Sequence, residues 1–168
     1  KEQNITVNYD EHVNDIYGID FSTVEKVNLV GGEPSIDENV DRFLQWLIDN
    51  GHLHLILSIT TNATNTNQSW MNKLKQFKEV LINVSLDGTG PTYEYIRTPA
   101  HWDTVEQNIL RYEQEYQVKF HVTCSMYNVP NIEDWIECFL VRDNLWNLWP
   151  VEGHHQLKLT SLYDDIRQ

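Results

Sequence analysis

The order of apolar and amphipathic segments predicts an α/β fold, a partial (βα) barrel-like parallel sheet of about five strands with helices on its outer face. Short aliphatic and β-branched runs alternate with longer stretches whose apolar residues recur at helical spacing. Each run ends in a cluster of glycine, asparagine, aspartate or proline. With 168 residues, 40% of them hydrophobic, the chain can bury one core, so we expect residues 1–168 to form a single domain.

The first predicted strand covers residues 26–30 and ends at the adjacent glycines Gly31 and Gly32. Two adjacent glycines allow positive φ and a close approach of the backbone to a ligand. Residues 35–38 then match a capping box, so we expect a helix to follow and to end at Gly51. Its apolar residues recur at helical spacing: Ile36, Val40, Phe43, Leu44 and Leu47.

The same alternation continues through the rest of the chain. An aliphatic run at residues 55–60 predicts the second strand, and Trp70, Leu74 and Phe77 predict the buried side of the next helix. The remaining expected elements are a helix at about 69–79, a strand at 81–85, a helix at 102–115, a strand at 118–126, a helix at 132–145 and a fifth strand at 157–162.

Polar residues follow several of these strands. Right-handed crossovers between parallel strands place all the carboxyl ends at one edge of the sheet, where ligands bind in open α/β sheets and barrels. Residues far apart in the sequence are therefore expected to meet at one rim: Glu33, Asn62, Ser85, Asp87 and Asn128.

Composition excludes several classes of protein. The formal charge of −13 argues against a nucleic-acid partner, because a polyanion would be repelled. No apolar run approaches the roughly 20 residues that span a bilayer, and the first residues lack a signal-peptide pattern, so we expect no membrane association and a cytoplasmic location. Two cysteines, Cys124 and Cys138, are too few for a disulfide scaffold or a cysteine-rich metal site and predict small buried side chains.

Four motifs occur in a fixed order. They are Gly-Gly-Glu-Pro at residues 31–34, Thr-Asn-Ala at 61–63, Ser-Leu-Asp-Gly at 85–88 and Tyr-Ile-Arg at 95–97, the last followed by Trp102 and Asn108. Taken together they resemble the radical S-adenosylmethionine (radical SAM) enzymes, in particular the branch that carries a C-terminal twitch domain. The resemblance covers about residues 24–128.

The resemblance implies which groups hold S-adenosylmethionine. Gly31, Gly32 and Glu33 would bind the amino group of its methionine part, and Arg97 would meet its carboxylate. Charge-assisted hydrogen bonds of this kind are about twice as strong as neutral ones, and a guanidinium matches a carboxylate bidentately. A solvated or salt-bridged surface arginine is the ordinary alternative for Arg97.

Four further residues follow from the same resemblance. Ser85 and Asp87 would lie near the ribose and carboxylate of the cofactor, Asn62 would come from the preceding strand, and Asn128 would lie near the adenine. Each residue also has a simpler interpretation: Asp87 belongs to a turn sequence, Asn62 can satisfy loop backbone, and Asn128 can cap the next turn. No catalytic side chain and no metal ligand are assigned.

One feature of the family is missing. Radical SAM chemistry uses a four-iron four-sulfur cluster held by three cysteines in the pattern Cys-x-x-x-Cys-x-x-Cys, and this sequence has no such motif. We therefore expect neither a cluster nor reductive cleavage in this chain by itself. Two interpretations remain, a fragment whose first βα unit is missing or a relative that keeps the fold as a non-catalytic binding or assembly module. The lysine at position 1 and the intact cofactor motifs favour the fragment.

Three further expectations concern edges, histidines and tryptophans. A missing first strand would expose the edge of strand 26–30, so we expect either self-association or coverage of that edge by residues 1–20.

The pairs His52/His54 and His154/His155 lack a third ligand and are expected at the surface, although a metal-dependent barrel hydrolase using Glu33, Asp87 and histidines stays an alternative. The substrate is not identified. Tryptophans on predicted helix faces are expected in the core: Trp46, Trp70, Trp102 and Trp135.

Overall fold

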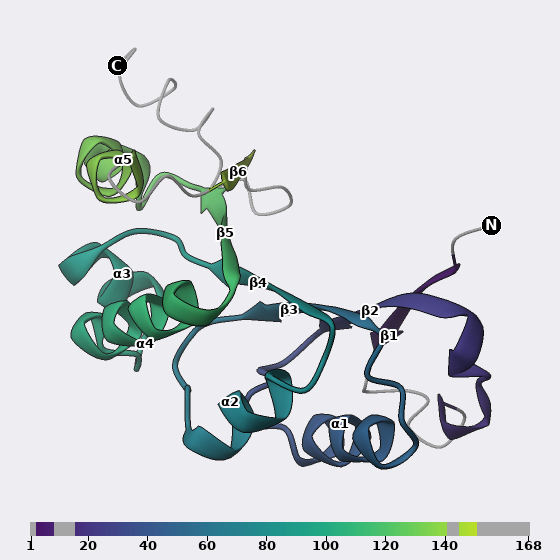
Figure 1. The fold of residues 1–168 in the computed structure, drawn as a ribbon. Helices are drawn as coiled ribbons and strands as arrows, with labels where there is room; N and C mark the ends of the chain where they lie inside the picture. Colours follow the sequence, from purple (N-terminus) through teal and green to yellow (C-terminus); the bar gives the residue numbers. More distant parts are fainter. Residues whose placement is uncertain (1–2, 9–15, 141–144, 151–168) are drawn as a thin grey trace.

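The computed structural model describes residues 3–8, 16–140 and 145–150, which form one parallel sheet with helices beside it (Figure 1). The strand order in the sheet is the order in the chain, and every neighbouring pair is parallel, which confirms the predicted fold class. The strands are β1 (Gln3–Asn8), β2 (Val24–Val30), β3 (Ile56–Thr61), β4 (Glu79–Ser85), β5 (Gln117–Cys124) and β6 (Leu145–Pro150).

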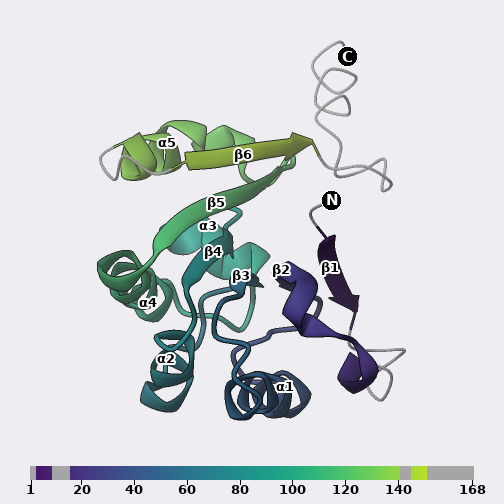
Figure 2. The same ribbon diagram turned by 45° about the vertical axis from the view of Figure 1, so that its right-hand side comes forward.

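Helices connect successive strands. The α-helices are α1 (Glu38–Asp49), α2 (Gln68–Leu74), α3 (Gly90–Ile96), α4 (Trp102–Glu115) and α5 (Ile132–Leu140), and short 3-10 helices are η1 (Ile16–Gly18), η2 (Phe21–Thr23) and η3 (Val129–Asn131). Figures 1 and 2 show α1, α2 and α4 on the same side of the sheet. None of the described helices combines the length and the apolar character that crossing a bilayer requires.

Alternation along the strands gives the sheet two different faces. From Val27 onward in β2, and throughout β3 to β5, every second residue is fully or almost fully buried against the helices, as Leu29, Ile59, Val84 and Phe120 are. The residues between them are only half-buried and mostly polar. We call the latter the inner face; its polar members in β2 to β5 include Lys26, Asn28, Ser58, Thr60, Asn83, Ser85, Lys119 and His121.

The parallel arrangement brings the carboxyl ends of the strands to one edge. We call this edge the carboxyl rim. It comprises the segments at the ends of β2 to β5, which are residues 31–35, 61–66, 85–90 and 123–128. Residues 93–101, in α3 and the loop after it, also belong to it. The N-terminal end of each following helix also starts there, so the rim is lined by loops rather than by the regular core.

The edge of β2 is covered by the N-terminal residues. β1 pairs with β2 in parallel, with Ile5 opposite Val27 and Asn8 opposite Val30. Coverage by residues 1–20 was one of the two expected outcomes for this edge and is confirmed, whereas self-association stays a prediction. β1 itself was not predicted, because residues 3–8 are too polar to indicate a buried strand.

The predicted capping box at residues 35–38 is wrong. α1 begins at Glu38, and its N-cap is Asp37, whose carboxylate accepts hydrogen bonds from the backbone N–H groups of Asn39 and Val40. Ser35 cannot cap the helix because its hydroxyl donates to the Glu33 carboxylate. Ile36 consequently lies in the preceding turn, 69% exposed, instead of on the buried side of the helix.

Other boundaries differ in ways that have local causes. α2 ends at Leu74, earlier than expected, because the chain must turn into β4 at Glu79. α3 was not predicted, since Gly90 and Pro91 are typical of a turn; yet proline is favoured in the first turn of a helix. β6 takes up Leu145–Pro150, where a helix end and a loop were expected, and pairs with β5. The strand expected at 157–162 and the pair His154/His155 lie outside the described residues.

Most of the expected core residues are buried. Trp70 is 2% exposed, Cys124 is buried, and Trp46 and Trp102 pack against the core. The side chains of Trp135 and Cys138 are not among those that the structure describes. The ring of His52 is half-buried beside Phe21 and Trp46, whereas His54 is exposed.

The cap of α1 provides a test of the fold. We expect Asp37→Ala to lower the free energy of unfolding by about 1 kcal/mol, because two helix N–H groups lose their acceptor. Asp49→Ala, which removes the same charge near the other end of α1, serves as the control and should change stability by less than about 0.5 kcal/mol. Urea unfolding followed by circular dichroism measures both, and equal effects of the two changes would contradict this assignment of the cap.

Candidate functional site

The chain leaves β2 through two glycines in the left-handed region. Gly31 has φ +92° and Gly32 has φ +52°, and both are exposed. A Cβ atom at Gly32 would meet no atom within 4 Å, so the backbone conformation, not the packing, requires glycine there. These φ values bend the chain at the rim and leave the backbone of the turn accessible.

The carboxylate of Glu33 ties the end of β2 to the end of β3. Its Oε1 accepts hydrogen bonds from the N–H of Ser35 (3.2 Å), from Ser35 Oγ (2.7 Å) and from Thr61 Oγ1 (2.6 Å). Among the described residues, its Oε2 accepts one hydrogen bond, from the N–H of Asn62 at 2.7 Å. A carboxylate oxygen has two lone pairs, so Oε2 can accept one further donor.

The loop after β3 is held in a strained conformation by α4. Ala63 is buried and has φ +56°, which costs a non-glycine residue about 1–2 kcal/mol. Asn108, a buried residue of α4, donates from Nδ2 to the Ala63 carbonyl at 2.9 Å and accepts from Thr66 Oγ1 at 2.6 Å. Asn108 is one of the motif residues, and these two hydrogen bonds hold the loop after β3 against α4.

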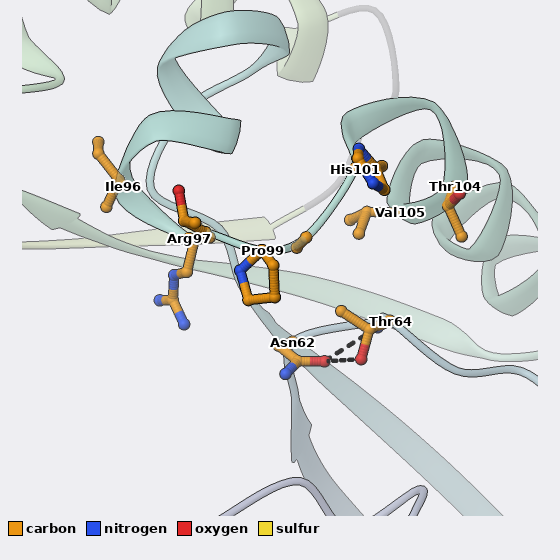
Figure 3. A pocket seen from close by; sticks show the side chains of 10 residues that line it. Asn62, Thr64, Ile96, Arg97, Pro99, His101, Thr104 and Val105 are labelled. Atoms are coloured by element: carbon orange, nitrogen blue, oxygen red, sulfur yellow. Dashed lines mark hydrogen bonds between the residues drawn. The ribbon is translucent and has the colours of Figure 1, made fainter.

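The two polar atoms of the Asn62 side chain differ in their hydrogen bonds to the described residues. Its Oδ1 accepts from the N–H of Thr64 at 2.9 Å and from Thr64 Oγ1 at 2.6 Å, as the dashed lines in Figure 3 show. Its Nδ2 makes no hydrogen bond with any residue that the structure describes, and it points to the side on which Arg97 lies (Figure 3). The loop interpretation and the binding interpretation of Asn62 thus apply to different atoms of one side chain.

Asp87 and Arg97 form an ion pair at the end of β4. Arg97 approaches Asp87 Oδ2 with Nε at 2.8 Å and with Nη2 at 2.6 Å, and Asp87 Oδ1 accepts from the N–H of Thr123 at 2.9 Å. Asp87 is 7% exposed, whereas the Arg97 side chain is 30% exposed. Both oxygens of Asp87 are used inside the protein, so Asp87 holds Arg97 in place, and Arg97 keeps unused N–H donors toward solvent.

Asn128 is completely buried below the rim. Its Oδ1 accepts from the N–H of Ser125 at 2.8 Å, and its Nδ2 donates to the carbonyls of Asp87 (3.0 Å) and Thr123 (2.8 Å). The amide thus links the turn after β5 to the end of β4. The simpler interpretation, that Asn128 caps the next turn, is wrong, because its side chain makes no capping hydrogen bond to η3. Asn128 has no exposed polar atom for an adenine.

Ser85 ends β4 on the inner face, directly opposite His121 of β5. The Ser85 hydroxyl makes no hydrogen bond with the described residues, and Nε2 of the His121 ring is buried without a partner. Burial is the main cause that lowers the pKa of His121, and the nearby Lys119 adds to it. The imidazole is therefore neutral at pH 7.

Tyr93 of α3 is a central residue that the sequence analysis missed. Its side chain is fully buried, and its hydroxyl lies 3.5 Å from the Asn62 carbonyl. Burial raises the pKa of Tyr93; Arg97 opposes this rise, and Asp87 and Glu33 add to it. The charges of Glu33, Asp87 and Arg97 thus all act on this hydroxyl, in agreement with the position of all three residues at the carboxyl rim. The signal that could have revealed it is Pro91, in the first turn of a short helix.

Asn62 and Arg97 line a pocket of about 630 Å³ between the end of β3 and the loop that joins α3 to α4 (Figure 3). Thr64, Pro99 and His101 also line it. Its ionisable side chains are the Arg97 guanidinium and the exposed His101, and Nδ1 of His101 lies 3.9 Å from Glu94 Oε1. With amide, hydroxyl and guanidinium donors, the pocket suits a small anionic group such as a carboxylate.

The part of the chain that the structure describes contains no comparable site for a metal ion or cluster. Among residues 3–8, 16–140 and 145–150 no three histidine, cysteine, aspartate or glutamate side chains gather closely enough to hold an ion. Cys124 is buried, and burial, together with Asp87, raises the pKa of its thiol, which disfavours a thiolate ligand. The residues present do not fit an iron-sulfur cluster, and the hydrolase alternative gains no ligand set.

Comparison with solved structures concerns the fold. The crystal structure of Streptococcus suis SuiB superimposes with a TM-score of 0.61 at 16% identity, and SuiB bound to S-adenosylmethionine with 0.59 at 17%. The likeness shows the fold. The α/β sheet of parallel strands matches part of the SuiB fold. Each match covers 86% of this chain but 36% of the SuiB chain, so the chain spans about a third of the protein it matches. No family model matches the sequence, and no curated protein matches it significantly.

The buried amide of Asn128 generates a prediction. We expect Asn128→Ala to lower the free energy of unfolding by about 2–4 kcal/mol, because the N–H of Ser125 and the carbonyls of Asp87 and Thr123 lose their partner. Asn72→Ala on the exposed side of α2 is the matched control. Urea unfolding measures both variants, and a loss below about 0.5 kcal/mol for Asn128→Ala would show that the amide does not hold β4 and β5 together.

Proposed function

We propose that this chain is part of a radical SAM protein and that its carboxyl rim binds the methionine end of S-adenosylmethionine. Oε2 of Glu33 accepts the ammonium group, and the guanidinium of Arg97, with Nδ2 of Asn62, binds the carboxylate. Gly31 and Gly32 bring the backbone of the turn close to the amino group.

The observation that carries the proposal is the convergence of one free acceptor and one free cationic donor on the same rim. Oε2 of Glu33 has a single donor, and Arg97 is only partly occupied by Asp87. Asn62 links the two, because its N–H donates to Glu33 and its side chain lines the pocket with Arg97. An acceptor and a cation in this arrangement suit a zwitterion, and the donor set fits the α-amino acid part of the cofactor.

Ser85, Asp87 and Asn128 take different parts in this proposal. Asp87 orients Arg97, and Asn128 supports Asp87 through its backbone carbonyl. Ser85 keeps its hydroxyl for the ribose.

The radical chemistry is assigned to the whole protein and not to this chain. In radical SAM enzymes a four-iron four-sulfur cluster reduces S-adenosylmethionine, and this sequence lacks the three-cysteine motif that would hold it. We therefore assign to these residues the binding and orientation of the cofactor. The competing function is a non-catalytic binding or assembly module, and the missing motif is the observation that favours it.

Titration calorimetry with S-adenosylmethionine tests the proposal. The wild-type chain should bind it, and Arg97→Gln should weaken binding about 10- to 100-fold, since a charge-assisted contact to the carboxylate is lost. Lys75→Gln is the matched control: Lys75 forms an exposed ion pair with Glu115, 2.8 Å apart, near the opposite edge of the sheet. Its affinity should equal that of the wild type.

Two results would contradict the proposal. The first is a wild-type chain that gives no heat of binding and no thermal shift with S-adenosylmethionine, which would favour the binding-module alternative. The second is equal affinity of the wild type and the Arg97→Gln variant. Circular dichroism of each variant establishes that the fold is intact before affinities are compared.

A further inference from the structure

One cation on the inner face has no carboxylate beside it. Lys119 lies within β5, where alternation with the buried Val118 and Phe120 places its side chain on the inner face. The side chain is half-buried and forms no ion pair with any residue that the structure describes. An ammonium group in this position loses part of its hydration, and no counter-ion of the protein offsets that cost. An anion that reached Lys119 would be bound by charge as well as by hydrogen bonds.

The surroundings of Lys119 in the sheet are neutral. The acidic residues of β2 to β5 are Glu25 and Glu79, and both are exposed, within the first two positions of their strands. Asn83 lies directly opposite Lys119 in β4, and its amide donates to Ser58 Oγ at 3.0 Å. In a chain with a net charge of −13, a half-buried cation among neutral side chains favours a negative ligand.

Lys119 lies on the inner face, one row below the carboxyl rim. It precedes His121 by two residues, and His121 is opposite Ser85 at the end of β4, so the row of Lys119 is about 6.6 Å below that level. The charge of Lys119 also contributes to the lowered pKa of His121, in agreement with this proximity. Figures 1 and 2 show α1, α2 and α4 on the other side of the sheet, so none of these three helices covers the row.

The position and the single charge limit the class of ligand. Because the row is recessed from the rim and its side chains are half-buried, it suits a small molecule better than a folded protein surface. A carboxylate carries one charge and matches one ammonium group, whereas a phosphate dianion would need a second cation. The other lysine of the inner face, Lys26, is three strands away and four residues lower in the register, about 13 Å along the strand direction.

We propose that Lys119 is a specificity-determining residue that binds a carboxylate group of a small-molecule substrate. This inference rests on the proposed function, in which the carboxyl rim holds S-adenosylmethionine beside the row of Lys119. It adds the chemical class of the substrate, a carboxylic acid that enters the inner face next to the cofactor.

The test compares 3-phenylpropionate with 3-phenylpropionamide, which has nearly the same shape but no charge, by ligand-observed nuclear magnetic resonance. The wild type should bind the carboxylate about three- to tenfold more tightly, although the net charge of the chain repels anions. Lys119→Met, which keeps the length of the side chain but removes the charge, should abolish the preference. Lys119→Arg should retain it, which a merely structural role of the lysine stem would not explain.

Lys26→Met is the matched control, because it removes the same charge from the same face at a distant position. This variant should keep the preference for 3-phenylpropionate. A loss of preference shared by Lys26→Met and Lys119→Met would overturn the assignment to Lys119. Circular dichroism establishes that each variant is folded, and Lys119→Gln serves as a second neutral variant.

A peptide probe tests the size of the ligand. Tighter binding of acetyl-Gly-Glu-Gly-amide than of 3-phenylpropionate would show that the carboxylate belongs to a peptide and would overturn the assignment to a small molecule. Weaker binding of this peptide would support that assignment.

The outcomes separate this inference from the proposed function. A wild type that does not bind S-adenosylmethionine but prefers 3-phenylpropionate, with the preference lost in Lys119→Met, would refute the proposed function and support the carboxylate site. Binding of S-adenosylmethionine that depends on Arg97, without any preference of the wild type for 3-phenylpropionate, would refute the carboxylate site alone. A preference that persists in Lys119→Met would also refute it.

Discussion

The hydrogen bonds of the Glu33 carboxylate are the interaction on which the rim depends. A parallel sheet aligns strand ends, but the loops beyond them need links of their own, because no strand pairing reaches that far. Glu33 provides one link by accepting from Thr61 Oγ1 and the N–H of Asn62. Asn62 then contacts Tyr93 through its carbonyl, and α3 leads on to Arg97. Residues 64 positions apart in the chain thus share one site.

The polar side chains of the carboxyl rim fall into two sets, those that hydrogen-bond inside the protein and those that face the pocket. Asp87, Asn108 and Asn128 direct their side-chain polar atoms into the protein and are 9% exposed or less. Arg97 and the Nδ2 atom of Asn62 keep unused donors at the pocket. This separation explains how a chain with a net charge of −13 presents a site for an anionic group, since the one guanidinium there is fixed by an aspartate that is itself buried.

The sequence predicts the sheet because burial against helices imposes an alternation of buried and less buried residues on most of β2 to β5. It predicts the rim because parallel strands share one direction. It does not predict how side chains divide their hydrogen bonds. The position of Ser35 matched a helix cap, yet its hydroxyl donates to the Glu33 carboxylate instead of capping α1. α3 carries residues typical of turns, so the sequence did not indicate that Tyr93 is a buried helical residue. The sequence has seven histidines, and only the pairing of β5 with its neighbouring strand distinguishes the environment of His121.

The most direct test of the account is a comparison of S-adenosylmethionine with its decarboxylated form in the wild-type chain and the Arg97→Gln variant. If Arg97 binds the carboxylate, the wild type prefers S-adenosylmethionine, and the variant binds the two ligands with equal affinity. A preference of the same size in both proteins would mean that the carboxylate lies elsewhere, and the zwitterion site between Glu33 and Arg97 would be wrong.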